Sequence, residues 1–366
     1  MKSAPEFRVA ALFGLRRIVF RIARTLMSLS CAGLVTSVAA VLAQEQSNPY
    51  TTWTVSIVLP PRLMASHPAT LAVLGVDGKL APGVTVTLGD GQTVTTDRTG
   101  RAVFTVPATG DYLLARGSGA SVAALIDPAA GASEPKETTL PPIVSTRDRF
   151  WICSAGLRGD ADANRVTING EPALVLAASP ECLVALPNPR VTPGAATISV
   201  ESPGTQATVK TTLVSLDFDA PQPELTPEKK SRLGVRVHGS DQKLGIVVEN
   251  QTPGVLRFVH GDTQELLTSG GPQNSAAVEV QAIRSGDYTF RAHALPAPDA
   301  AVAQRYLQAA TALAPKELQR DIKGLATRLE RHPRDVQVVR AKLGEILRQT
   351  SGGDFRTLLD AAWQAL

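Results

Sequence analysis

Four oxygen-bearing residues have the spacing of a calcium-binding loop. At positions 1, 3, 5 and 12 of an EF-hand pattern lie Asp160, Asp162, Asn164 and Glu171. Oxygen ligands at such intervals can wrap a calcium ion. The pattern requires glycine at its sixth position, however, and Arg165 stands there at the start of a run with β composition. A turn before a strand is therefore the competing interpretation, and we expect no bound metal or cofactor.

Other motifs that carry chemistry are short or missing in the sequence. Arg158-Gly159-Asp160 matches an integrin-type tripeptide, although a turn explains it equally well. The sequence contains no H-E-x-x-H zinc motif, no nucleophile elbow, no P-loop and no dinucleotide-binding glycine pattern. We therefore expect no enzyme activity.

Residues 1–43 have the layout of a secretory signal peptide. Six basic residues precede an uncharged stretch from Thr25 to Ala43, and small or aliphatic residues occupy the last positions. An uncleaved membrane anchor is the alternative, because this stretch is just long enough to span a bilayer. We expect export to the periplasm, the cell surface or the medium, with membrane contact only through an uncleaved leader.

The basic charge of the chain belongs to this leader. The whole sequence has 37 Lys and Arg against 33 Asp and Glu, but residues 1–43 hold six of the basic residues and one of the acids. The remainder is close to neutral, so it has no field that would attract nucleic acid. We expect a protein partner or a component of the cell envelope instead.

After residue 43 the sequence holds two cysteines, Cys153 and Cys182. Two cysteines in an exported chain predict one disulfide, and two free buried thiols are the alternative.

Short apolar runs separated by turn residues fill residues 44–126. Asp90-Gly91 between Val84–Leu88 and Thr93–Val94 predicts a hairpin, because glycine supplies the positive φ that the turn requires. Over about residues 55–126 the sequence resembles bacterial Ig-like and carboxypeptidase-regulatory-like repeats. Three segments carry the resemblance: A-P-G-V-T-V at 81–86, T-D-R-T-G-R-A at 96–102 and G-D-Y at 110–112. The resemblance implies a β-sandwich without catalytic residues. Residues 127–145, rich in Pro, Ala, Ser and Thr, are predicted to be a linker.

Residues 146–216 carry the most specific pattern. A predicted strand ends in the turn Asn169-Gly170. Four segments follow in order: A-L-V-L at 173–176, C-L-V-A-L-P at 182–187, T-P-G at 192–194 and A-T-I-S-V at 196–200. Over about residues 147–214 this order resembles the IPT/TIG family of Ig-like folds, although its opening, W-I-C-S-A-G-L-R-G, departs from the family pattern. The resemblance implies a scaffold or interaction module. A third sandwich is predicted for residues 217–298, after a charged, Pro-rich boundary.

From residue 299 the apolar spacing becomes helical, so residues 299–366 are predicted to form a helical bundle or helical hairpins. We expect the last apolar stripe to bind a partner, through Phe355, Leu359, Trp363 and Leu366.

The whole chain is thus predicted to be mainly β, with tandem Ig-like sandwiches and a small C-terminal helical domain. We expect an exported, non-enzymatic protein for surface display, adhesion or protein–protein interaction. The alternative is a carbohydrate-binding or accessory module of a polysaccharide-processing system, which would require a surface row of Trp or Tyr.

Overall fold

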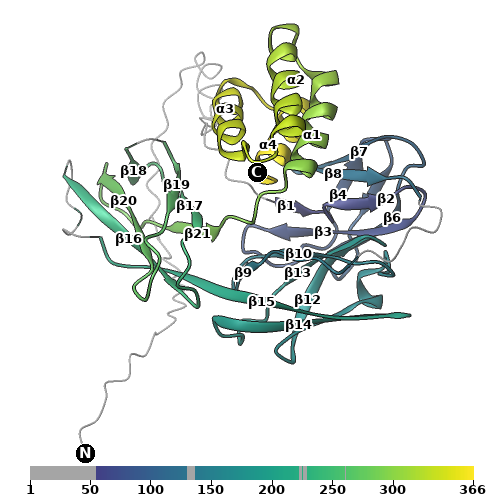
Figure 1. Ribbon diagram of the computed structural model, residues 1–366, viewed down its shortest axis with the longest axis horizontal. Helices are drawn as coiled ribbons and strands as arrows, with labels where there is room; N and C mark the ends of the chain where they lie inside the picture. The colour runs from purple at the N-terminus through teal and green to yellow at the C-terminus, as the bar shows by residue number, and fades with distance from the viewer. Residues whose placement is uncertain (1–54, 130–136, 222–224, 226–228, 260) are drawn as a thin grey trace, which may run out of the picture. The chain divides into compact units, whose positions relative to one another are not determined.

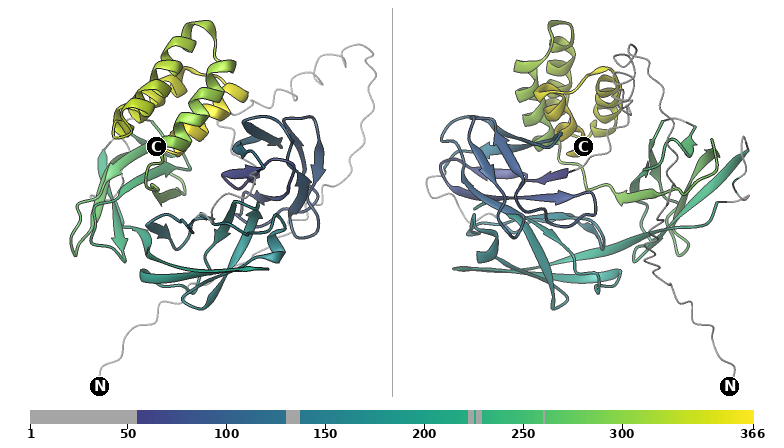
Figure 2. Two further views of the ribbon diagram at one scale, coloured as in Figure 1. Left: turned by 45° about the vertical axis from the view of Figure 1, so that its right-hand side comes forward. Right: turned by 180° about the vertical axis from the view of Figure 1, so that it is seen from behind.

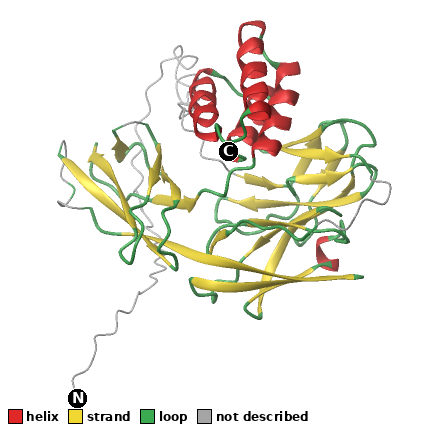
Figure 3. Ribbon diagram, viewed as in Figure 1, coloured by secondary structure: helices red, strands yellow, loops and turns green. Residues whose placement is uncertain are grey.

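The computed structural model describes residues 55–129, 137–221, 225, 229–259 and 261–366. These residues form several β-sheets followed by four helices that pack together (Figure 1, Figure 3). The predicted fold class is therefore confirmed. The predicted leader, residues 1–43, lies outside the described residues. In the described part of the chain, no helix is long and apolar enough to cross a bilayer.

The first β unit consists of two sheets packed on one core. Its strands are β1 (Val55–Val58), β2 (Arg62–Met64), β3 (Pro68–Gly75), β4 (Thr85–Leu88), β5 (Thr93–Thr95), β6 (Arg101–Thr105), β7 (Tyr112–Gly117) and β8 (Ala120–Asp127). One sheet has the order β2-β8-β7-β4-β5, and β3 pairs with β1 and β6 in the other. Leu71 and Phe104 from one sheet meet Leu88 and Leu113 from the other. The predicted hairpin is present, since β4 pairs with β5 and Gly91 has a φ of 86°.

The second β unit contains the pattern that resembles IPT/TIG modules. Its elements are β9 (Ile143–Ser145), β10 (Phe150–Cys153), the 3₁₀ turn η1 (Ala161–Ala163), β11 (Arg165–Ile168), β12 (Glu171–Ala178), β13 (Cys182–Leu186), β14 (Gly194–Ser202) and β15 (Thr205–Phe218). Asn169 and Gly170 both have positive φ, 52° and 86°, and they close the predicted hairpin between β11 and β12. Strand β9 lies inside the predicted linker and pairs in parallel with β15.

Backbone pairing continues from one β unit to the next. Ala178 of β12 pairs with Thr70 of β3, which connects the first and second units. Strand β15 pairs with β14 along most of its length, and its last four residues, Ser215–Phe218, pair with the third unit (Figure 1, Figure 2). The predicted boundary between residues 216 and 217 therefore falls inside one continuous strand.

The third β unit again has two sheets around one core. Its strands are β16 (Lys230–His238), β17 (Gly245–Asn250), β18 (Leu256–Phe258), β19 (Thr263–Leu267), β20 (Ser275–Ala282) and β21 (Phe290–Ala294). Strands β16, β20 and β18 extend the sheet of β15, and β19-β17-β21 form the other sheet. Val235 and Val280 from the first sheet share a core with Ile246 and Val248 from the second.

The helical segment follows directly. It consists of α1 (Ala300–Leu313), α2 (Lys316–Arg331), α3 (Val336–Gln349) and α4 (Asp354–Gln364). The Asp299 carboxylate accepts a hydrogen bond from the Val302 backbone N–H at 3.0 Å and caps α1. Gly353, with a φ of 114°, precedes α4, and Asp354 is the first residue of this helix. The core of the helices also includes Leu114, Ala123 and Leu125 from β7 and β8.

Candidate functional site

The acidic calcium candidates are engaged with their own chain. The Asp160 carboxylate accepts a hydrogen bond from the Asp162 backbone N–H at 3.0 Å and so caps η1. The Asp162 carboxylate accepts a hydrogen bond from Arg101 Nη1 at 2.7 Å, and Arg101 Nη2 donates to the Val175 carbonyl at 2.6 Å. This arginine belongs to β6, so the contact joins the first β unit to the second.

The other two calcium candidates have structural positions as well. Asn164 is buried, and its amide donates to the carbonyls of Arg158 at 2.8 Å and Asp160 at 2.7 Å. Glu171 begins β12, opposite Ile168. Among the described residues no group of three His, Cys, Asp or Glu is placed to hold a metal ion. Asp160, Asp162 and Asn164 thus lie in and beside a capped turn, where their side chains bond within the chain.

The glycine of the Arg-Gly-Asp tripeptide lies in a tight junction. Gly159 is buried, and its carbonyl accepts a hydrogen bond from the Thr70 hydroxyl at 2.6 Å. A Cβ atom on Gly159 would lie 1.8 Å from the carbonyl oxygen of Pro68. The tripeptide therefore closes the contact between the first two β units, and its exposed Arg158 and Asp160 flank that contact.

Cys153 and Cys182 form the predicted disulfide. The two residues face each other in register on the antiparallel strands β10 and β13. The bond therefore fastens two neighbours in one sheet.

The four predicted partner-binding residues belong to the core of the helical segment. Leu359 and Leu366 are buried, at 0% and 2% exposed, so a partner cannot reach them while the helices stay packed. Phe355 and Trp363 are half-buried and pack against the same core. The apolar stripe of α4 therefore packs within the chain's own helical core.

Charged and polar contacts hold α1 on the first β unit. Asp127, at the end of β8, pairs with Arg62 from β2 and with Arg305 from α1, each at 2.7 Å. Burial opposes ionisation of Asp127, but the two arginine hydrogen bonds outweigh it and hold the pKa of this carboxyl below its usual value. Next to Arg305, the buried Tyr306 hydroxyl donates to the Ala123 carbonyl at 3.3 Å, and burial raises the pKa of this phenol.

A second set of polar contacts holds α4 on the same unit. Arg116 of β7 forms an ion pair with Asp354. The Ser121 hydroxyl of β8 lies 2.5 Å from that of Thr357. Together with the shared apolar core, these contacts make the helices a built-in part of the first β unit.

One arginine joins the helices to the third β unit. Arg340 of α3 is buried, and its Nε and Nη2 donate to both carboxylate oxygens of Glu265 on β19 at 3.0–3.2 Å. Its guanidinium also lies 4.1 Å from the ring centroid of Trp363 on α4. Such a bidentate pair stacked on an aromatic ring is specific for arginine. The signal in the sequence is a charge between Val336 and Leu343, inside an apolar stripe.

His293 of β21 lies in the same polar surroundings. Burial lowers its pKa, and the positive charges of Arg291 and Arg340 act in the same direction. The carboxylates of Glu249 and Asp148 act in the opposite direction but do not outweigh burial. The neutral imidazole is therefore favoured here.

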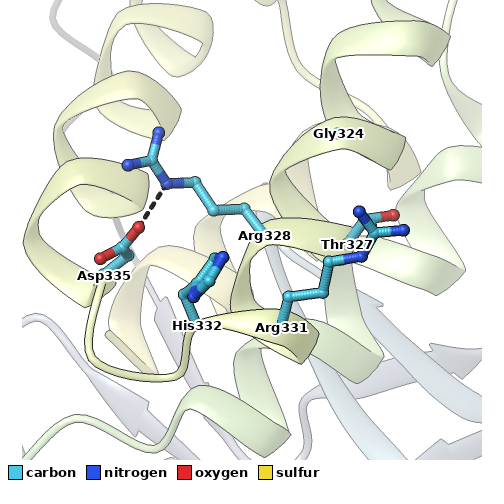
Figure 4. A pocket seen from close by; sticks show the side chains of 6 residues that line it. All are labelled: Gly324, Thr327, Arg328, Arg331, His332 and Asp335. Carbon is cyan, nitrogen blue, oxygen red and sulfur yellow. Dashed lines mark hydrogen bonds and ion pairs between the residues drawn. The ribbon is translucent and has the colours of Figure 1, made fainter.

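The outer surface of α2 carries an open pocket of about 520 Å³. Its lining consists of Gly324, Thr327, Arg328, Arg331, His332 and Asp335 (Figure 4). Arg328 forms an ion pair with Asp335 at 2.7 Å, which ties the end of α2 to the start of α3. Arg331 and Thr327 lie on the other side of His332 (Figure 4). Within the described residues Arg331 forms no ion pair or hydrogen bond, so its guanidinium is available.

Comparisons with known proteins give partial likenesses only. No protein-family model matches the chain, and no curated protein does. Among solved structures, the extracellular region of plexin A4 is 12% identical with a TM-score of 0.26, over 64% of this chain and 22% of that one. SGBP-B from the mixed-linkage glucan utilization locus of Bacteroides ovatus, solved with a heptasaccharide, is 11% identical with a TM-score of 0.23. The match covers 61% of this chain and 70% of that one. The surface layer protein SbsC is 13% identical with a TM-score of 0.16, over 65% of this chain and 38% of that one.

This chain thus spans about a fifth of the plexin chain that it matches. By name, the plexin region is extracellular and SbsC is a surface layer protein.

Proposed function

We propose that this is an exported, non-enzymatic protein that presents the outer surface of its helices to a protein partner. The observation that carries the proposal is the fixed attachment of the helices. Arg305 and Asp354 hold them on the first β unit, and Arg340 holds them on the third. A surface held at several points loses little conformational entropy on binding, which favours recognition.

The β units have the role of a scaffold in this proposal. Their charged side chains, such as Arg101 and Asp162, connect one unit to the next. The resemblance of residues 147–214 to IPT/TIG modules agrees with such a role. The carbohydrate alternative requires a row of exposed aromatic rings. Among the described aromatic residues Tyr288 is exposed, but Trp151 and Trp363 are half-buried and Tyr306 is buried, so these rings do not form such a row.

Photo-cross-linking in cells tests the interaction. A photoreactive amino acid is placed at Lys323 on α2 or, as a matched control, at Lys210 on β15, since both lysines are exposed. We expect a discrete adduct from position 323 and none from 210. No adduct from 323, or the same adducts from both positions, would count against the proposal.

Export is tested separately by fractionation and thiol labelling. A chain exported through a cleaved signal peptide loses residues 1–43, and its two remaining cysteines resist alkylation until a reductant is added. A full-length chain in the cytosol with two reactive thiols would contradict export.

A further inference from the structure

One glycine on α2 has no packing role that would explain it. Gly324 lies in the interior of α2 and is exposed, and a Cβ atom there would meet nothing within 4 Å. Alanine would favour the helix by about 1 kcal/mol relative to glycine at such a position. Packing within the chain therefore does not require glycine at position 324.

The residues around Gly324 form a stripe along one side of the helix. Arg320, Gly324, Thr327 and Arg331 follow at intervals of four, three and four residues, which places them on one face. At a rise of about 1.5 Å per residue the two arginines are roughly 17 Å apart along the axis. Both are exposed, and neither forms an ion pair with another described residue. A cation thus stands at each end of a shallow stripe of small residues.

We propose that this stripe binds an acidic segment of a protein partner, with its backbone lying over Gly324. A carboxylate can accept two hydrogen bonds from the Arg331 guanidinium, and the Thr327 hydroxyl is a further donor. An extended segment of about five residues spans the distance between the arginines. An isolated anion would use only one end and would not require the space above Gly324. This inference rests on the proposed function and names the chemistry of the partner.

The test measures binding of a fluorescein-labelled octaglutamate peptide to the full mature chain at low salt, by fluorescence anisotropy. Arg331→Ala should weaken binding about tenfold, as expected for a lost bidentate ion pair. Gly324→Leu should also weaken binding, because its side chain fills the stripe without changing charge. The same variant should raise the melting temperature slightly, since leucine is the better helix former.

Lys210→Ala is the matched control, because it removes one positive charge from an exposed position on β15, outside α2. It should bind octaglutamate as the wild type does. The proposal is overturned if the wild type does not bind the peptide, if Gly324→Leu binds it normally, or if Lys210→Ala loses as much affinity as Arg331→Ala. Polyphosphate serves as a second probe. If both polyphosphate and octaglutamate bind Gly324→Leu as tightly as they bind the wild type, the binding is simple charge attraction and the stripe has no role in it. An in-cell adduct from position 323 without octaglutamate binding would overturn only the acidic chemistry and leave the proposed function standing.

Discussion

Arg340 is the residue on which the contact between the helices and the third β unit depends most. Replacing it with leucine removes a bidentate ion pair and the stacking on Trp363, and it leaves Glu265 without its partner. Loss of one partner of a fully buried pair costs about 3–5 kcal/mol. The Glu265 side chain is 37% exposed, so water offsets part of this loss, and we expect about 2 kcal/mol.

Chemical denaturation of Arg340→Leu, Glu265→Gln and the double variant measures this coupling. Arg340→Lys is the informative control, because it keeps the charge but loses the planar fork, and we expect it to recover little stability. Additive effects of the two single changes would show that the pair contributes nothing.

Gly159 supplies a second prediction at this scale. Alanine there places a Cβ against the Pro68 carbonyl, so we expect a loss of about 1–3 kcal/mol, as for other overpacked sites. Gly324→Ala is the matched control, since its Cβ meets open space, and it should leave stability unchanged or slightly raised. Thermal unfolding of both variants checks the difference. Equal melting temperatures would contradict the tight junction.

Single residues were the hardest part to predict from the sequence. The spacing of Asp160, Asp162 and Asn164 allowed both a calcium loop and a turn, because sequence shows which oxygens are near in the chain but not which donors they accept from. In the structure Arg101 and backbone N–H groups donate to these oxygens. The disulfide was easier to predict, because the sequence after residue 43 offers only one pair of cysteines.

At the scale of elements, the disulfide fastens β10 to β13. Among the described strands β10 pairs with β13 alone, and outside the strands an isolated bridge joins Cys153 to Thr139. A cross-link that closes a loop of 29 residues contributes about 3–4 kcal/mol in the chain-entropy model. Replacing both cysteines with serine should lower the free energy of unfolding by about this amount in denaturant titrations. An unchanged midpoint would mean that the strand pairing alone holds β10.

Most elements could be predicted from turn residues and apolar spacing, because both act locally. The Asn169-Gly170 and Asp90-Gly91 hairpins are examples. The continuity of β15 could not be predicted. Its last residues, Asp217 and Phe218, opened a segment with the composition of a linker, but they pair with Arg236 and Val235 of the next unit. Such long-range pairing overrides local composition.

At the scale of the whole molecule, Asp127 connects α1 with β2 and β8, and its ionisation should contribute to stability. Its pKa is lowered in the folded chain, so its contribution is fully present above the unfolded value of about 3.9. The contribution is lost as the pH falls through the lower folded value. We therefore expect the free energy of unfolding to fall more steeply between pH 4 and about pH 2 in the wild type than in Asp127→Asn. Parallel pH profiles would show that the arginine pairs do not favour the ionised carboxyl.

The central claim is that the helices are a fixed part of the β scaffold and therefore present α2 in one place. Native-state hydrogen exchange, read by mass spectrometry on the intact chain, tests it most directly. Because α1 and α4 share a core with β7 and β8, we predict that the protected amides of all four elements exchange with the same free energy of opening. Helices that exchange at a distinctly lower free energy while β7 and β8 stay protected would contradict the claim, since such helices would be a detachable tail.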